Sequence, residues 1–275
     1  MDVKKRVLFV SQEISPYLPE SDLSNLGRTL PQGIMERGKD IRIFMPKFGC
    51  INERRNQLHE VIRLSGMNMI LDNLDYPLII KVASLQPVRM QVYFIENEDY
   101  FPKKTFMHEL DGEFFEFHDE RVIFFCRGVL ETVKKLGWAP DVVHCNGWMT
   151  SLLPMYLKKA FADDPIFADT KIVYSVYDQE IEGELSNDMA RKTIVNGVEK
   201  EDISVIDEAT INNLHRLAID FADAVIIGSE KIDPEIEQYI IESGKSSLPY
   251  HDEEDCVEVF DSLYDELLEQ EPILT

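Results

Sequence analysis

The sequence predicts an α/β fold, a doubly wound parallel sheet of the Rossmann-like kind, and three observations lead to this prediction. Short apolar runs rich in β-branched and aromatic residues alternate along the chain with longer segments of helical periodicity. The runs are apolar at consecutive positions, which is typical of strands that are buried on both faces. The chain has 275 residues, of which 44% are hydrophobic, enough to form one large core.

The first elements form a βαβ unit. RVLFVSQ at residues 6–12 is the first strand, and NLGRTLPQGIMERGKD at residues 25–40 has the spacing of a helix. Gly38 stands where that helix would stop. IRIFMP at residues 41–46 is the second strand, and a right-handed crossover makes the two strands parallel.

The rest of the domain continues the alternation. LIIKVASLQ at residues 78–86 and RMQVYFIEN at residues 89–97 are expected to form a hairpin-like pair with a turn at Pro87. Helices are expected over residues 120–137, 150–162 and 206–223, and strands over residues 140–148, 170–178 and 224–230, the last of these being the last clear strand.

Two regions are expected along the chain. Residues 1–243 form the α/β domain, and residues 244–275 form an acidic tail in which no Lys or Arg follows His251. Apolar residues nevertheless recur in the tail near helical spacing, at Val257, Phe260, Leu263, Tyr264 and Leu267. We expect this stripe to dock on an exposed edge of the domain, and the alternative is an arm that binds a partner.

Composition excludes several classes of function. The net charge of −23 argues against a nucleic-acid or anionic-membrane surface, because phosphate contacts need clustered Lys and Arg. No apolar run approaches a membrane span, and the N-terminal one is too short for a signal peptide. The four cysteines lack metal-ligand spacing and indicate reduced thiols in a cytoplasmic protein, with no metal or cofactor expected. The basic residues of KKRVLF are interpreted as ordinary solvated positions.

Four segments between Val7 and about Glu230 carry a resemblance to a known family. They are VLFVSQEISPY, LGRTLPQGIMERGKDIRIFMPKFG, DERVIFFCRGVLETVKKLGWAPDVVHCNGWMTSLLPMYLKK and LAIDFADAVIIGSE. These segments, in this order, resemble the N-terminal, acceptor-side domain of bacterial glycogen and starch synthases, the family-five glycosyltransferases of GT-B architecture. The chain most closely resembles the short, single-domain members of that family.

The resemblance implies retaining transfer of glucose from ADP-glucose or UDP-glucose to the end of an α-1,4-glucan. In the family two Rossmann-like domains close over the donor, and the C-terminal domain makes most donor contacts. No second Gly-rich βα unit and no cationic nucleotide motif follows Ser229. Because charge develops on the diphosphate as the glycosidic bond breaks, we expect this chain to be inactive alone.

The first βα turn carries the clearest departure from the family. The Lys-x-Gly-Gly motif of the family falls on Pro19, Glu20, Ser21 and Asp22. In the family the lysine meets the diphosphate and the glycines let the backbone approach it closely. Pro19 removes an N–H donor, and the acids at 20 and 22 repel an anion. We expect a relic of an anion site, retuned for a neutral ligand.

Four residues are the candidates for glucan binding by resemblance. The His-x-His-Asp-Trp-His stretch of the family begins here at His144, with Asn146 in place of the second histidine and Trp148 kept. The Thr-Ile-His-Asn stretch places Tyr177 at its own histidine. Trp148 could stack on a glucose ring at the carboxyl end of the sheet. Packing in the core is the favoured interpretation of both His144 and Trp148.

The start of the long helix carries a mixed signal. The Asp-Asn pair of the family becomes Phe117 and His118, while its Glu-Arg pair is kept as Glu120 and Arg121. The frame of the family is therefore kept, and its donor chemistry is not.

Two hypotheses about function remain open. In the first, the protein takes part in glucosyl transfer in glycogen biosynthesis by completing a site with a separate C-domain partner. In the second, it is a non-enzymatic domain that binds α-glucan or a glycogen synthase and regulates or places it. The acidic turn favours the second for the isolated chain, and a protein–protein adaptor unrelated to glucan is a third interpretation.

Overall fold

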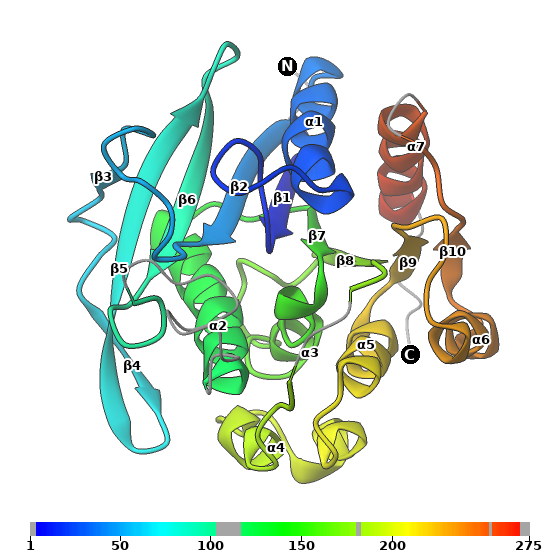
Figure 1. The fold of residues 1–275 in the computed structure, drawn as a ribbon. Helices are drawn as coiled ribbons and strands as arrows, with labels where there is room; N and C mark the ends of the chain where they lie inside the picture. Colours follow the sequence, from blue (N-terminus) through cyan, green and yellow to red (C-terminus); the bar gives the residue numbers. More distant parts are fainter. Residues whose placement is uncertain (1–3, 103–116, 180–182, 253–254, 270–275) are drawn as a thin grey trace.

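The structure, a computed structural model, describes residues 4–102, 117–179, 183–252 and 255–269. The sheet has ten strands in the order β10-β9-β8-β7-β1-β2-β6-β5-β3, with β4 paired to β5 (Figure 1). The strands are β1 Arg6–Ser11, β2 Asp40–Pro46, β3 His59–Glu60, β4 Met67–Leu71, β5 Leu74–Leu85, β6 Met90–Glu96, β7 Val142–Asn146, β8 Lys171–Val176, β9 Ala224–Ile227 and β10 Ser246–Leu248.

The predicted doubly wound α/β fold is confirmed. The path from β10 to β6 is parallel throughout, and β5 then pairs antiparallel with β6, β4 and β3. The βαβ unit expected at the N-terminus is present, with Val7 opposite Ile41, and so is the hairpin-like pair. The helices are α1 Asp22–Glu36, α2 His118–Leu136, α3 Leu153–Lys158, α4 Met189–Thr193, α5 Ile211–Phe221, α6 Pro234–Ser243 and α7 Cys256–Glu269.

The helices form two groups on the sheet (Figure 1). Helix α1 packs against β1, β2 and α7, while α2, α3, α5 and α6 contact one another in series. Right-handed crossovers to one side of β1 and then to the other place α1 opposite the second group. The central strands are thus covered on both faces, which explains why β1 and β7 are buried along nearly their whole length.

Helix α1 begins earlier than expected because its N-cap is Ser21. The Ser21 side chain accepts a hydrogen bond from the Ser24 N–H, and the Ser24 side chain accepts one from the Ser21 N–H, a reciprocal capping box. Gly27 lets α1 lie close to the chain after β1, since a Cβ there would come within 2.6 Å of the Glu13 carbonyl oxygen. The helix therefore starts inside the turn that the sequence placed before it.

Two other elements differ from expectation. The helix expected over 150–162 is shorter, because Gly147 has a φ of +88° and opens a 3-10 turn over Trp148–Thr150 before α3 begins. The sheet also continues past the strand expected to be the last clear one. Strand β10 pairs in parallel with β9 and takes its residues from the segment expected to be the acidic tail.

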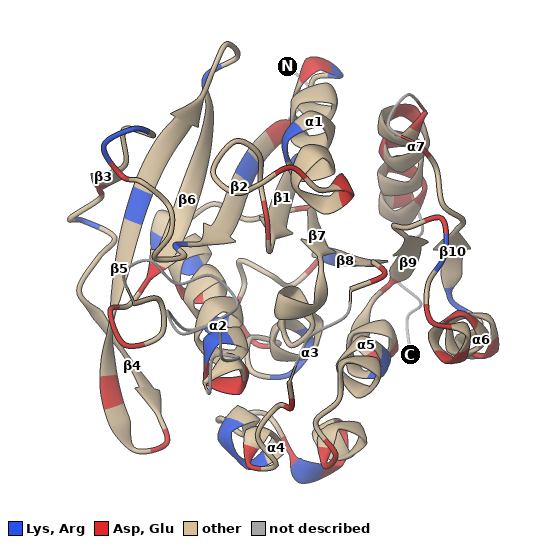
Figure 2. Ribbon diagram, viewed as in Figure 1, with Lys and Arg blue, Asp and Glu red and all other residues tan. Residues whose placement is uncertain are grey.

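Helix α7 lies beside α1 (Figure 1), and in Figure 2 it carries acidic positions and no basic ones. Its side chains Cys256, Phe260, Leu263, Tyr264 and Leu267 are buried. Val257 packs over Gly33 of α1, where a Cβ would come within 2.5 Å of the valine side chain. The stripe expected from the tail therefore faces the domain.

Candidate functional site

The direction of the strand order reverses at β1, between β2 on one side and β7 on the other. Open α/β sheets bind ligands outside the carboxyl ends of the strands at such a point. Ser11 ends β1 opposite Asn146 of β7, so the chain segments that follow these residues lie at the same edge of the sheet. We define the carboxyl-edge site as Gln12, Glu13, the turn 19–22, Asn146, Trp148, Tyr177 and Gln179.

Gln12 and Glu13 directly follow β1 at this site, and they were not singled out from the sequence. Gln12 is buried, accepts a hydrogen bond from the Met149 N–H at 3.3 Å and donates to Glu13 Oε1 at 2.9 Å. Burial raises the pKa of the Glu13 carboxyl. The available signal was a polar pair directly after a buried strand.

The turn 19–22 is exposed and closed on itself. Ser21 Oγ accepts from the Ser24 N–H at 3.0 Å and donates to Glu13 Oε2 at 3.1 Å. Ser24 Oγ donates to the Pro19 carbonyl at 2.9 Å. Asp22 lies in the first turn of α1, where the helix dipole favours a negative charge. The N–H group of Ser24 at the start of α1 is therefore hydrogen-bonded to Ser21, and the positive end of the helix dipole faces Asp22 of the same helix.

His144 is a buried, neutral histidine in the core. Its Nδ1 lies 2.6 Å from the Tyr264 hydroxyl of α7, and its Nε2 lies 2.6 Å from Ser175 Oγ. Burial lowers the pKa of His144 to about 3. The rings of Phe9 and Phe260 pack at 5.9 Å from the imidazole. No face of His144 is open to a ligand, and its position couples β7 to α7.

Asn146, Trp148 and Tyr177 are brought together as an inner wall. The Tyr177 hydroxyl donates to Asn146 Oδ1 at 3.1 Å. Trp148 is 1% exposed and packs edge-on against His118, with ring centroids 5.9 Å apart. Its backbone N–H donates to Gln179 Oε1 at 3.4 Å. Neither aromatic ring offers an exposed face for stacking on a sugar in this structure.

A cavity of about 540 Å³ opens beside this wall, and Tyr177 lines it. Its polar lining includes Asp178, Gln179 and Asn212, and Lys and Arg are absent from the described residues around it. His215 also lines it, with a pKa lowered to about 4 by burial, so that the imidazole is neutral at pH 7. This lining suits a neutral, hydroxyl-rich ligand better than an anion.

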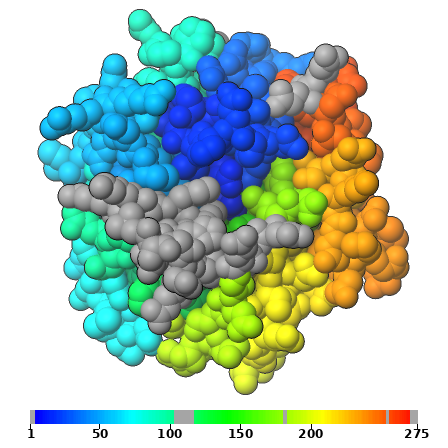
Figure 3. Space-filling model, in the orientation of Figure 1, coloured from blue at the N-terminus to red at the C-terminus, as the bar shows by residue number. Residues whose placement is uncertain are grey.

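Figure 3 shows the N-terminal segment, dark blue, beside the yellow-green segment that follows β8, on one face of the molecule. The carboxyl-edge site lies where these segments meet. Its charged residues are the acids Glu13, Glu20 and Asp22, and Asp178 lines the adjoining cavity. The site therefore repels phosphate groups and tolerates uncharged ones.

Glu120 and Arg121, the Glu-Arg pair of the resemblance, both contact other residues of the chain. Lys192 of α4 pairs with Asp119 at 3.0 Å and with Glu120 at 2.5 Å, and all three side chains are largely buried. The Arg121 side chain donates to the Tyr100 carbonyl. These contacts fix the start of α2 near Trp148. The ammonium of Lys192 is paired with the two carboxylates Asp119 and Glu120.

The described residues offer no grouping of three or more His, Cys, Asp or Glu side chains suited to a metal ion. Among the helices described, none is long and apolar enough to cross a bilayer. The cysteines are free thiols, three of them buried.

The comparisons with known proteins agree with the resemblance of the sequence segments. The model of the starch synthase catalytic domain matches residues 6–247. The glycogen synthase of Chlorobium limicola is 40% identical over 173 residues, which cover 62% of this chain and 35% of that protein. The glycogen synthase of Chlorobaculum parvum is 35% identical over 225 residues, which cover 80% of this chain and 45% of that protein.

A solved structure shows the same fold. The catalytic domain of starch synthase IV from Arabidopsis thaliana, bound to ADP and acarbose, superposes with a TM-score of 0.73 at 19% identity. The match covers 90% of this chain and 51% of that one, and the matches to the two glycogen synthases cover less than half of each. The predicted family is confirmed by the family match, and the chain belongs to the starch synthase catalytic domain family.

Proposed function

We propose that this chain serves glycogen biosynthesis as a synthase-family domain that contacts α-glucan and does not transfer glucose from ADP-glucose or UDP-glucose by itself. The observation that carries the proposal is the turn 19–22, which is acidic, exposed and hydrogen-bonded to itself and to Glu13. The family's Lys-x-Gly-Gly motif falls on this turn, and the resemblance implies that a transferase needs its cationic and backbone donors to bind the diphosphate.

Electrostatics give the sign of the effect. Two like charges about 4 Å apart repel by roughly 4 kcal/mol at an effective dielectric constant of about 20. The turn is exposed, so solvent and salt reduce the figure to about 1 kcal/mol or less for each contact. Glu13, Glu20 and Asp22 all lie near the turn, and each makes diphosphate binding weaker.

A glucan is uncharged, and the acidic surface does not oppose it. We propose that the cavity beside Tyr177 receives glucose units through Gln179, Asn212 and the rim carboxylate of Asp178. Asn146 and Tyr177 then act as the wall behind the sugar, and His144 and Trp148 support that wall from the core. This role is supported by polar, cation-free lining and by the family of the chain.

The partner that fits this role is a second protein that binds the nucleotide sugar, either a separate C-domain or a complete glycogen synthase. In that arrangement the chain supplies glucan contact and its partner supplies the donor. The nucleotide stays with the partner because the turn 19–22 cannot bind it.

Glucosyl transfer and glycogen binding are tested separately. The purified chain is incubated with radiolabelled ADP-glucose or UDP-glucose and glycogen, and a parallel sample without nucleotide is sedimented with glycogen. We expect no label in glycogen and co-sedimentation of the protein. Gln179→Ala with Asn212→Ala should weaken co-sedimentation, whereas the exposed Gln238→Ala should not.

Label transferred to glycogen would contradict the inactive role of the chain. Absence of co-sedimentation would contradict the glucan contact and favour an adaptor unrelated to glucan.

A further inference from the structure

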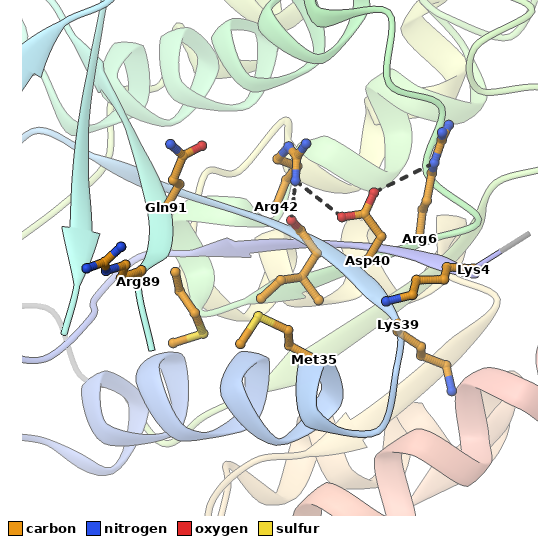
Figure 4. Close-up of a pocket in the computed structure, with 10 residues that line it drawn as sticks. Lys4, Arg6, Met35, Lys39, Asp40, Arg42, Arg89 and Gln91 are labelled. Carbon is orange, nitrogen blue, oxygen red and sulfur yellow. Dashed lines mark hydrogen bonds and ion pairs between the residues drawn. The ribbon is translucent and has the colours of Figure 1, made fainter. Parts of the chain in front are cut away.

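A second cavity, of about 500 Å³, lies at the opposite end of the strands, where Arg6 begins β1 and Asp40 begins β2 (Figure 4). Although the chain has a net charge of −23, half of the residues that line this cavity are basic. They are Lys4, Arg6, Lys39, Arg42 and Arg89, and Asp40 is the acid among the described lining residues.

Asp40 is neutralised by its neighbours. Its Oδ2 accepts a hydrogen bond from Trp138 Nε1 at 2.9 Å, and its Oδ1 accepts one from Arg42 at 3.3 Å. Arg6 Nε lies 3.9 Å from the same carboxylate, and both guanidinium groups lie over the Trp138 ring, at 5.8 and 5.2 Å from its centroid. The ring and the carboxylate fix the two arginines in place.

Lys39 is turned away from the cavity. Its ammonium pairs with Asp261 at 2.6 Å and with Asp265 at 2.9 Å, both on α7, and Figure 4 shows its side chain directed out of the cavity. Lys4 and Arg89 are exposed, and neither makes an ion pair with another described residue. Four cations then remain beside Asp40 and beside Asp141, whose carboxylate accepts a hydrogen bond from the Arg6 N–H at 2.7 Å, so the local excess is about two positive charges.

The lower wall of the cavity is apolar. Met35 of α1 lies below the strands in Figure 4, and Ile41 and Met90 also line the cavity. Asp261 and Asp265 also lie close to the cavity, but both carboxylates are paired with Lys39. A phosphate group fits the cationic rim, and a short carbon skeleton fits the methionine side.

We propose that this amino-edge cavity is a binding site for a small organic phosphate. Arg6 and Arg42 form its preorganised part, and Lys4 and Arg89 close on the ligand from the rim. The proposal is independent of glucan binding, since the cavity is formed at the end of the strands opposite to the carboxyl-edge site.

The test is a titration of the purified chain with inorganic phosphate and with glycerol 3-phosphate, and with glycerol as the uncharged control, followed by backbone amide NMR shifts. We expect saturable shifts at β1, β2 and the β5–β6 turn for both phosphates, at millimolar dissociation constants that increase with added salt. Glycerol should cause none.

Variants then separate a site from a general charge effect. Lys4→Gln with Arg89→Gln should weaken binding about tenfold, because two exposed charge contacts are lost. Arg63→Gln with Lys200→Gln removes the same charge from exposed positions outside the cavity and should leave the affinity within about twofold.

Three results would overturn the proposal. They are the absence of saturable shifts at tens of millimolar phosphate, equal weakening in both double variants, and shifts that gather at Gln12 and Ser24 instead of at the amino edge.

Discussion

The two ends of the same parallel strands carry opposite charge. At the carboxyl end Glu13, Glu20 and Asp22 surround the start of α1, and no described Lys or Arg lines the adjoining cavity. At the amino end half of the lining residues are basic, and the acid among them is already paired. Rossmann-like sheets place phosphates at the carboxyl end, and under the proposed function the acids at that end weaken diphosphate binding.

This difference shows that the fold and the charge of a site are separate properties of a sequence. The backbone frame at the carboxyl end is intact, with the β1–α1 turn, the left-handed Gly147 and the helix terminus all in place. By the resemblance, a proline, two acids and a self-capping serine stand at the positions of the family's Lys-x-Gly-Gly motif. A family fold therefore predicts where a ligand would bind, and the side chains decide which ligand is accepted.

The largest effect is expected from helix α7, whose acids hold Lys39 at the amino end. Deleting residues 252–275 removes the buried Phe260 and Tyr264 and should lower the free energy of unfolding by more than the single change Phe260→Ala, for which we expect about 3–5 kcal/mol. Urea denaturation measures both. Glu266→Ala on the exposed face of α7 is the control, and a deletion variant as stable as the full chain would contradict the docking of α7.

A smaller effect is expected from acid, because His144 and His215 are buried and neutral with pKa values lowered to about 3 and about 4. The unfolded chain binds these protons below about pH 6.5 and the folded chain does not, so stability present above pH 6.5 is lost as the pH falls. By pH 5 each histidine should cost about 2 kcal/mol.

The pH effect is measured by urea denaturation at pH 7 and pH 5 for the full chain and for His144→Gln. The variant should be less stable at pH 7 and should lose about 2 kcal/mol less between the two pH values. An equal loss in both proteins would show that His144 titrates normally.

The sequence predicted the frame well because strands buried on both faces leave an unambiguous apolar pattern. Residues 6–12 follow that rule, and the stripe of α7 follows the helical spacing that places its apolar residues on one face. The acidic character of the turn was also predicted, because the charges of Glu20 and Asp22 follow from the sequence alone.

The packing of side chains from distant parts of the chain, and their hydrogen-bond partners, could not be predicted from the sequence. The burial of Trp148 depends on neighbours far along the chain, and a tryptophan near a strand end has the same sequence signal whether it is buried or exposed. Lys4 and Arg6 seemed ordinary in the sequence because their cavity is completed by Arg42 of β2 and by Arg89 of the β5–β6 turn. The hydrogen bonds between Ser21 and Ser24 could be recognised only once the helix was known to begin at Asp22, because they depend on Ser21 being its N-cap.

A modest effect is expected at the turn itself. Ser21→Ala removes the cap of α1 and its hydrogen bond to Glu13, and should cost about 1 kcal/mol of stability. Glu20→Ala, one residue away and without a cap role, should change stability by less than about 0.5 kcal/mol. Equal losses of stability for Ser21→Ala and Glu20→Ala in thermal or urea denaturation would show that the cap does not hold the turn.

The most direct test of the charge reversal is a calorimetric titration of the full chain with ADP-glucose, accompanied by backbone amide NMR. The acidic, self-capped turn predicts no saturable heat at millimolar ligand and no shift at the amides of Ser21, Ser24 and Asn25. Saturable binding with shifts at these three amides would show that the carboxyl end still accepts a nucleotide sugar, and it would contradict the account.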